Sequence, residues 1–402
     1  MMIKVIIRYS LLFMTLMVSA ACSNPDGKGD IDRIVDQYNY TAGTQTIGAR
    51  YRFTEDPTLV ETAKRILEMG SNMIKMALTP IEGDEELVSW KEAMPKALAS
   101  ENPILKNVLD MDFSYYFMWV TTPGVNWNDG MTEEESELEY KAIRELAEYL
   151  LKEYEGSNKH FFIGHWEGDW LLLGNYSRTQ ERIDPVRIEG MTSWFKIRQK
   201  AIEDARDAVE SKDVEVFHYL ELNRVNPTMR TGADRIVNTV LPYVDVDYVS
   251  YSSYESTSEE ISGADYEELK SYLGASLDFI ESHLKPNPSI QGRRIFIGEY
   301  GYSLPIVGND PQEQARRAVN TIRAAIEWGC LFVLYWEMYD NEGDDKGFWM
   351  IDSHNEKQPV YEVHSNYYKH MRSYVREYVR KNGHAPSSED FRESALDYLS
   401  SL

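Results

Sequence analysis

The chain has 402 residues, with 42 lysines and arginines against 66 aspartates and glutamates, which gives a net charge of −24 at neutral pH. A surface this acidic repels nucleic acid, anionic lipid and polyanionic substrates, so the composition argues against proteins that bind those partners. The length is sufficient for one large domain with a core of its own.

The N-terminus has the pattern of an export signal. Lys4 and Arg8 precede an apolar run over residues 9–18, and the small residues at 19–21 lead to Cys22. The apolar run is too short to span a membrane, and small residues end it, as in a cleaved signal. The small residues before a single cysteine resemble a bacterial lipoprotein signal, in which Cys22 is lipidated and becomes the first residue of the mature chain. The alternative is an ordinary secretory signal with a cysteine there by chance.

These features predict four segments along the chain. Residues 1–21 are the signal peptide, 22–45 a tether and N-terminal segment, 46–382 the main domain, and 383–402 a C-terminal extension that holds a short terminal helix. We expect a flexible tether over 23–32, because this stretch is polar and contains glycine. The lipoprotein resemblance implies a location in the bacterial cell envelope, with membrane contact through the N-terminal lipid alone.

Eight short apolar segments alternate with longer segments of helical periodicity. Their nearly continuous apolar character is typical of parallel strands covered by helices. Because no glycine-rich phosphate-binding motif occurs, the pattern predicts a single-domain α/β fold, a (β/α)8 TIM barrel, rather than a doubly wound sheet. The candidate strands are 46–51, 73–78, 113–121, 160–166, 214–222, 247–251, 294–299 and 330–336.

Two of the candidate strands lead into a glutamate. The sequence FFIGHWE ends in Glu167, and the sequence IFIGEYG contains Glu299. Catalytic groups of (β/α)8 barrels lie at the C-terminal ends of strands, here the fourth and the seventh. Two carboxylates that face each other across a sugar are the minimal equipment for cleaving a glycosidic bond.

Alternation along a strand predicts which side chains lie beneath the two glutamates. If Glu299 faces the barrel mouth, Ile297 lines the interior beneath it, and the same parity places Ile163 and His165 under Glu167. We expect His165 to orient a neighbouring group by hydrogen bonding, since no second histidine stands at metal-ligand spacing. The sequence indicates neither a metal site nor a cofactor.

These residues resemble the clan of retaining β-glycosidases built on (β/α)8 barrels. The resemblance rests on the sequence IGEYG at 297–301, on Glu167, and on Trp336 at the end of the eighth strand. It implies that Glu299 is the nucleophile and Glu167 the acid/base. It also implies that Trp336 forms the floor of the sugar subsite next to the bond that is cut.

The resemblance extends to a tyrosine and departs at one position. Tyr251 or Tyr254, at the end of strand six, matches the tyrosine that holds the nucleophile in that clan. An asparagine usually precedes the acid/base there and contacts the sugar 2-hydroxyl, whereas Trp166 precedes Glu167 here. We expect either that Asn223, after strand five, takes this contact or that the chain is a divergent member.

Further candidates surround the pair of glutamates. Trp170 is expected to contact substrate alongside Trp166, and Arg50 and Lys75, on strands one and two, are placed to hydrogen-bond or stabilise charge near the site. Glu221 and Glu337 are rival carboxylates. Glu337 neighbours Trp336 and so points to the opposite side, while Glu221 becomes the acid if the fifth strand has another register.

The sequence leaves three functions open. The first is a retaining glycosidase acting on a neutral β-linked poly- or oligosaccharide, with the carbohydrate as its partner. The second is a lipid-anchored carbohydrate-binding protein on a barrel without catalysis, which the missing asparagine motivates. The third, a metal-dependent hydrolase on the same barrel, has less support because the sequence indicates no metal site.

Overall fold

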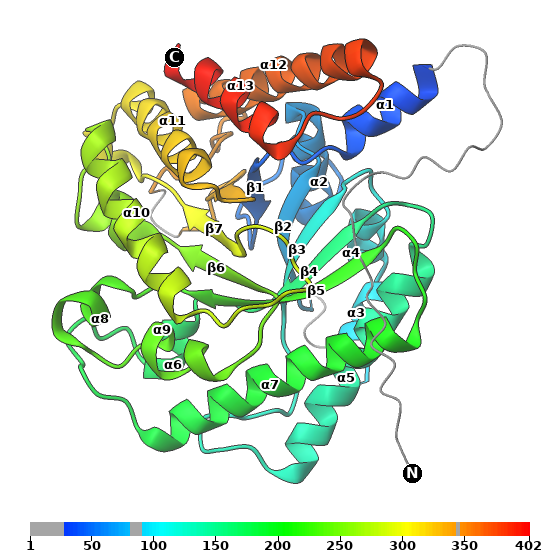
Figure 1. Ribbon diagram of the computed structural model, residues 1–402, viewed down its shortest axis with the longest axis vertical. Helices are drawn as coiled ribbons and strands as arrows, with labels where there is room; N and C mark the ends of the chain where they lie inside the picture. The colour runs from blue at the N-terminus through cyan, green and yellow to red at the C-terminus, as the bar shows by residue number, and fades with distance from the viewer. Residues whose placement is uncertain (1–27, 81–90, 343–345) are drawn as a thin grey trace, which may run out of the picture.

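The structure is a computed structural model that describes residues 28–80, 91–342 and 346–402. Eight parallel strands each pair with the next, and β8 pairs with β1, so the sheet closes into a barrel (Figure 1). The predicted (β/α)8 TIM barrel is therefore confirmed. The strands are β1 Ala42–Thr46, β2 Met73–Leu78, β3 Tyr115–Val120, β4 His160–Gly164, β5 Glu215–Leu222, β6 Tyr248–Ser252, β7 Ile295–Tyr300 and β8 Val333–Tyr335.

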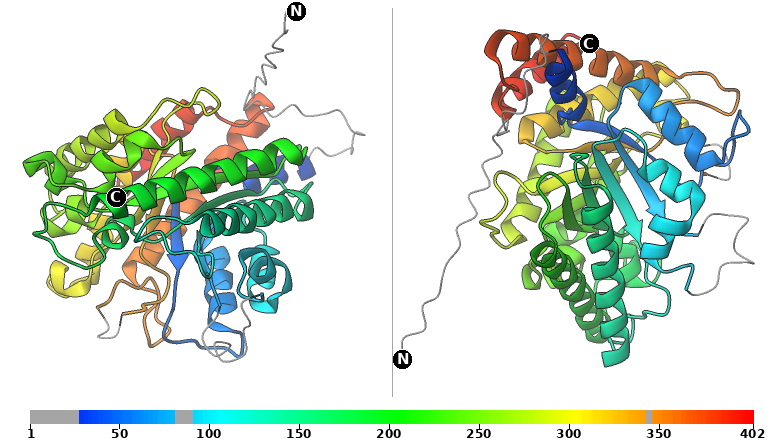
Figure 2. Two further views of the ribbon diagram at one scale, coloured as in Figure 1. Left: turned by 90° about the horizontal axis from the view of Figure 1, so that it is seen from below. Right: turned by 90° about the vertical axis from the view of Figure 1, so that its right-hand side faces the viewer.

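Helices follow the strands and surround the barrel, as the two views in Figure 2 show. Among the described residues, no helix is long and apolar enough to cross a membrane. The α-helices are α1 Lys28–Gln37, α2 Thr58–Met69, α3 Pro95–Glu101, α4 Pro103–Leu109, α5 Glu133–Glu153, α6 Gly168–Leu173, α7 Pro185–Ala208, α8 Asn226–Thr231, α9 Ile236–Thr239, α10 Tyr266–His283, α11 Pro311–Trp328, α12 Pro359–Asn382 and α13 Ser388–Ser400. Three short turns of other helix types are η1 Leu241–Tyr243, η2 Glu255–Glu259 and η3 Leu304–Val307.

The first strand lies earlier than the sequence pattern indicates. β1 covers Ala42–Thr46, whereas the apolar pattern predicted a strand over 46–51. The prediction was wrong because the true strand is small and polar, although all five of its residues are buried. Polar groups are tolerated there when they are hydrogen-bonded, and the Thr44 hydroxyl donates to the Tyr335 carbonyl at 3.0 Å. The folded domain accordingly begins before residue 46.

Helix α1 occupies part of the segment predicted as a flexible tether, so that prediction was wrong from Lys28 onward. The side-chain amide of Asn72, just before β2, donates to the Asp36 and Tyr38 carbonyls, at 2.8 Å in each case. Asp36 also forms an ion pair with Arg372 of α12. Helix α1 therefore ends against the N-terminal ends of the barrel strands.

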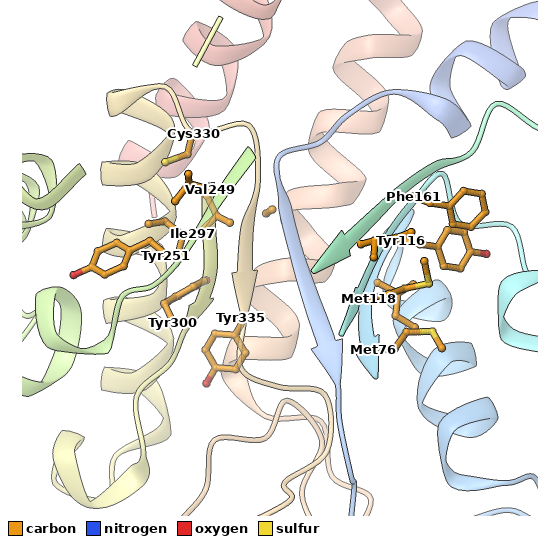
Figure 3. Close-up of a cluster of buried hydrophobic side chains, with 14 of the residues drawn as sticks. Met76, Tyr116, Met118, Phe161, Val249, Tyr251, Ile297, Tyr300, Cys330 and Tyr335 are labelled. Atoms are coloured by element: carbon orange, nitrogen blue, oxygen red, sulfur yellow. The ribbon is translucent and has the colours of Figure 1, made fainter. Parts of the chain in front are cut away.

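Two apolar layers lie on opposite sides of the sheet. The interior of the barrel is aromatic, and the rings of Phe117 and Phe162 stack there with centroids 4.6 Å apart. The second layer lies between the strands and the helices, and Figure 3 shows part of it. Ile163 and Ile297 belong to this outer layer, so the predicted parity of β4 and β7 was wrong. The interior positions of these strands are those of Phe162 and Phe296.

A bulge in β7 explains how Glu299 still reaches the barrel mouth. The pairing of β6 with β7 advances from Tyr251 opposite Ile297 to Ser252 opposite Glu299, so β7 contains one extra residue. Gly298 is required at the bulge, because a Cβ atom there would lie 1.8 Å from Ser250 Oγ. The glycine before Glu299 therefore allows the close approach of β6 to β7 at the site.

A buried ion pair ties the ends of β3 and β4 to the surrounding helices. Arg198 of α7 and Glu139 of α5 lie 3.1 Å apart, and both side chains are fully buried. The guanidinium of Arg198 also donates to the carbonyls of Val120 at 3.1 Å and of Gly164 at 3.0 Å. This pair holds the strand ends from which the segment bearing Glu167 departs.

We expect the substitution Glu139→Ala to destabilise the protein by about 3–5 kcal/mol, because it leaves the Arg198 guanidinium buried without its counter-charge. The free energy of unfolding in urea measures this loss. Lys141→Ala is the matched control on the same helix, since Lys141 forms an exposed ion pair with Glu145; its cost should be at most about 1 kcal/mol. Equal effects of the two substitutions would contradict the structural role of the buried pair.

Candidate active site

A layer of charged side chains lies above the aromatic interior, at the C-terminal ends of the strands. Lys75 comes from β2, Glu221 from β5 and Glu299 from β7, and all three are buried. Glu167 follows β4 and is 8% exposed. The two glutamates that the sequence singled out therefore lie with a third carboxylate and a lysine.

Lys75 is the cation at the centre of this layer. Its Nζ lies 2.7 Å from Glu221 Oε2, 2.9 Å from Glu299 Oε1 and 3.2 Å from the Gly298 carbonyl oxygen. These acceptors match the three donors of an ammonium group. Burial acts to lower the pKa of Lys75, but the charges of Glu221 and Glu299 outweigh burial and raise it. Lys75 is therefore charged and joins the two carboxylates.

Glu221 is surrounded by donors on both of its oxygens. Oε1 accepts the Glu167 backbone N–H at 3.0 Å. Oε2 accepts Lys75 and, at 2.8 Å, the Ser250 hydroxyl. This is the environment of a carboxylate rather than of a carboxylic acid, because neither oxygen faces an acceptor. The geometry disfavours the rival assignment of Glu221 as the acid.

Glu299 also accepts hydrogen bonds on both oxygens. Besides Lys75 on Oε1, the Tyr254 hydroxyl donates to Oε2 at 3.3 Å. Burial raises the pKa of Glu299 to about 7, with Lys75 acting to lower it and Glu221 to raise it. The two donors favour the ionised form, so Glu299 is the more readily ionised of the predicted pair.

Glu167 lies in a different environment. It stands directly before α6 rather than on β4, which ends at Gly164. Burial, followed by the nearby charges of Glu299 and Glu221, raises the pKa of Glu167 well above its ordinary value. Lys75 acts in the opposite direction but does not prevent the shift. Burial and the neighbouring carboxylates therefore favour the protonated form of Glu167.

His165 lies behind the site and not in it. Its ring packs against Trp194 and Phe195 of α7, with centroids 5.4 and 4.9 Å away. Nε2 accepts the Glu221 backbone N–H at 3.1 Å, which leaves the proton on Nδ1 to donate to the Trp166 carbonyl at 2.9 Å. Burial lowers the pKa of His165 to about 3, so it stays neutral. His165 orients its neighbours by hydrogen bonding, as the sequence predicted, but the place predicted for it in the barrel interior under Glu167 was wrong, because alternation turns its ring toward the helices.

The two tyrosines offered by the sequence have different positions. Tyr254 contacts Glu299, as described above. Tyr251 faces the outer layer (Figure 3), where its hydroxyl bonds Ser256 at 2.6 Å and Glu255 at 3.2 Å. Tyr251 was therefore wrongly proposed as a site residue, since β6 ends at Ser252 and Tyr254 turns back over the barrel mouth.

Two tryptophans line the barrel mouth. Trp336, after β8, is 8% exposed, and its ring lies 6.3 Å from the ring of Trp119 on β3, with an angle of 28° between their planes. The Trp119 ring in turn covers Lys75, whose Nζ is 4.8 Å from the ring centroid. Sequence reasoning missed Trp119, although it lies two residues beyond the interior Phe117 on the same strand. The two rings flank the charged layer.

A second aromatic group lies near Glu167. Trp166 and Trp170 are half-buried, and both rings lie close to Tyr176, at 6.3 and 5.8 Å between centroids. Tyr176 is 71% exposed, and the sequence pattern gave no signal for it because it follows α6 in a loop. The Arg224 guanidinium lies 5.3 Å from the Trp170 ring centroid. These rings provide a flat apolar surface on the side of the acid.

Asn223 secures the segment that carries Glu167. Its side-chain amide oxygen accepts the Asp169 backbone N–H at 3.2 Å, and its backbone N–H donates to the Asp169 carboxylate at 2.9 Å. That buried carboxylate also accepts the N–H groups of Arg224 at 2.9 Å and Ile236 at 2.8 Å. Asn223 therefore holds α6 against the end of β5, and its contact with a sugar stays a prediction.

Arg50 lies in the loop that follows β1, and Glu337 lies in the loop that follows β8. Arg50 is exposed, and its Nε donates to the Asn341 carbonyl at 2.7 Å. Its placement at the end of the first strand was wrong because β1 ends at Thr46, so Arg50 joins two loops instead of facing the glutamates. The Glu337 carboxylate accepts the Ile47 N–H at 3.1 Å; that its side chain points away from Trp336 stays a prediction.

The remaining candidates concern metal binding and lipidation. Within residues 28–80, 91–342 and 346–402, no cluster of three or more histidine, cysteine, aspartate or glutamate side chains is placed to hold a metal ion. Cys22 lies outside the described residues. Cys330 is buried and free, and burial raises the pKa of its thiol.

Comparisons with known proteins place the fold among solved structures. No protein-family model and no curated protein matches the chain. A GH5_18 variant from Streptomyces cattleya, solved with Manb1-4GlcNAc, matches with a TM-score of 0.53 and 11% identity over 82% of this chain and 77% of that chain. The exo-beta-1,4-mannosidase Op5Man5 from Opitutaceae bacterium strain TAV5 gives a TM-score of 0.53 and 11% identity over 83% and 60%. A family 5 xyloglucanase from Paenibacillus pabuli gives 0.50 and 12% over 83% and 99%. At these identities the likeness shows a shared barrel fold.

The substitution Glu167→Gln is expected to raise the free energy of unfolding, relative to that of the wild type, by an amount that increases with pH. In the native chain the raised pKa of Glu167 means that the folded state keeps a proton which the unfolded state releases above the ordinary value of 4.5. Stability is therefore lost as the pH rises from that value toward the folded-state pKa, by about 1.4 kcal/mol for each unit between the two.

Urea unfolding between about pH 4 and pH 7 tests this linkage. The free energy of unfolding of Glu167→Gln, minus that of the wild type, should grow with pH across this range. A difference that stays constant would show that Glu167 has an ordinary pKa in the folded protein.

Proposed function

We propose that the protein is a retaining glycoside hydrolase that cleaves β-glycosidic bonds of a neutral poly- or oligosaccharide. The observation that carries this proposal is the contrast between two buried glutamates at the barrel mouth. Glu299 accepts hydrogen bonds from Lys75 and Tyr254, whereas Glu167 lies next to two carboxylates. Retaining glycosidases need one ionised and one protonated carboxyl group at the same pH.

In the proposed mechanism Glu299 attacks the anomeric carbon of a sugar bound beside Trp336. Glu167 donates its proton to the leaving glycosidic oxygen, and a covalent glycosyl–enzyme forms on Glu299. Glu167, now ionised, then takes a proton from water as the water attacks the anomeric carbon and releases Glu299. Lys75 and Tyr254 stabilise the Glu299 carboxylate before attack and after release.

The structural neighbours and the charge of the chain support the substrate class. By their names, the neighbours include an exo-beta-1,4-mannosidase and a xyloglucanase, and one is in complex with Manb1-4GlcNAc. The net charge of −24 disfavours a polyanionic substrate. The aromatic surface of Trp166, Trp170 and Tyr176 lies on the acid side, which is the side of the leaving group, and fits the apolar face of a further sugar ring.

The location proposed for the protein is the bacterial cell envelope, with Cys22 as the lipid anchor. Only residues 23–27 separate Cys22 from helix α1. Because α1 ends against the N-terminal ends of the strands, an anchor there would lie on the face opposite the glutamates. This arrangement would direct the barrel mouth away from the lipid, toward glycans outside the membrane.

Substitution of the two glutamates tests the enzymatic proposal. Purified protein is first screened against aryl β-glycosides and plant, host and microbial polysaccharides. Glu299→Gln should abolish turnover and leave ligand affinity nearly intact, whereas Glu167→Gln should lower kcat by about 10²–10⁴-fold on substrates with a poor leaving group. Glu134→Gln, on the exposed first turn of α5, is the matched control and should keep full activity.

Two outcomes would contradict this proposal. Unchanged turnover by Glu299→Gln would remove the nucleophile from its role. A glycan that binds tightly but is not cleaved by the native chain would instead favour the non-catalytic carbohydrate-binding protein.

Membrane fractionation tests the anchor. The native chain should partition with membranes, and Cys22→Ser should release it or block its processing. Cys330→Ser is the control, because Cys330 is buried in the folded barrel and should not affect partitioning. Recovery of the native chain wholly in the soluble extract, with an unmodified N-terminus after residue 21, would refute lipidation and leave secretion alone.

A further inference from the structure

Glu221 is a buried carboxylate that the proposed mechanism does not use. It contacts Glu167 through a backbone N–H and Glu299 through Lys75, so a continuous chain of polar contacts joins the two proposed catalytic groups. The contacts come from β2, β5, β7 and the segment after β4. We infer that Glu221 is the positioning residue of this site, which holds the Glu167 backbone and, through Lys75, the Glu299 carboxylate in a fixed relation. This inference rests on the proposed function.

The geometry explains why this role falls to Glu221. Trp166 stands where an asparagine would contact the sugar, and its carbonyl is held by His165, whose other ring nitrogen accepts the Glu221 N–H. The Glu221 side chain then returns to the Glu167 N–H. Main chain and side chain of one residue therefore hold, through His165 and directly, the carbonyl and the N–H of the single peptide group that joins Trp166 to Glu167.

The Glu221 charge also acts on both proposed catalytic groups. It contributes to raising the pKa of Glu167 and that of Glu299, while Lys75 opposes it in both. A neutral residue of the same shape would therefore lower both pKa values. Other titratable groups also face the cluster, and the Glu221 substitution leaves all of them in place. They are His165, Tyr219, Tyr254, Glu259 and Glu337.

The test is a titration of protein labelled with ¹³C at the glutamate carboxyl carbon. NMR signals of Glu167 and Glu299 are assigned from Glu167→Gln and Glu299→Gln, and are then followed with pH in the native chain and in Glu221→Gln. We expect both pKa values to fall in Glu221→Gln, by about one unit or more, because a nearby like charge is lost. Ser250→Ala removes a donor to Glu221 but keeps its charge, so it should leave both values unchanged.

Unchanged values in folded Glu221→Gln would overturn the inference, since a merely structural residue alters stability and not these titrations. If Glu221→Gln does not fold, the substitution Lys75→Met provides the test. It removes the cation that joins Glu221 to Glu299, so it should raise the pKa of Glu299. An unchanged pKa of Glu299 would contradict the inference. The titration needs no substrate, so it stands even if the protein turns over no glycan. On any glycan that is cleaved, Glu221→Gln should move the pH optimum of kcat/KM to lower pH.

Discussion

The ion pairs of Lys75 with Glu221 and Glu299 are the interaction on which the site depends. All three side chains are buried, and an isolated charge at such a depth would cost several kcal/mol. The cost is offset because every donor of the ammonium group has an acceptor, and each carboxylate receives a second donor, Ser250 or Tyr254. Loss of Lys75 would leave two buried carboxylates without their counter-charge. The cluster therefore acts as a unit that fixes the ends of β2, β5, β6 and β7 relative to one another.

This cluster divides the two proposed catalytic glutamates by environment. The Glu299 carboxylate belongs to the cluster and forms an ion pair with Lys75. Glu167 contacts the cluster through its backbone N–H, and its side chain lies in the negative field of Glu299 and Glu221. One carboxyl group is thereby stabilised as a base and its neighbour as an acid. The Trp119 ring covers Lys75 and lies beside the Trp336 ring, and apolar rings in such a position lower the local dielectric, which strengthens both effects.

Sequence reasoning predicted the barrel and the two glutamates because both depend on local patterns. Strand periodicity and a glutamate at a strand end are visible in a few consecutive residues. It could not predict the bulge at Gly298, which reverses the parity of β7, since that depends on how closely β6 approaches. Nor could it pair Lys75 with Glu221, which stand 146 positions apart in the sequence. The polar strand β1 was misplaced because its burial follows from hydrogen bonding and not from apolar character.

In the proposed mechanism Glu299 forms a covalent bond to the sugar while Glu167 acts as acid and base. The most direct measurement is exposure of the native chain to 2-deoxy-2-fluoro-β-glycosyl fluorides of several sugars, followed by mass spectrometry of the intact protein and its peptides. These reagents form the glycosyl–enzyme and hydrolyse it slowly. We expect a single adduct, on Glu299. An adduct on Glu221 or Glu167, or turnover without an adduct and with inversion at the anomeric carbon, would contradict it.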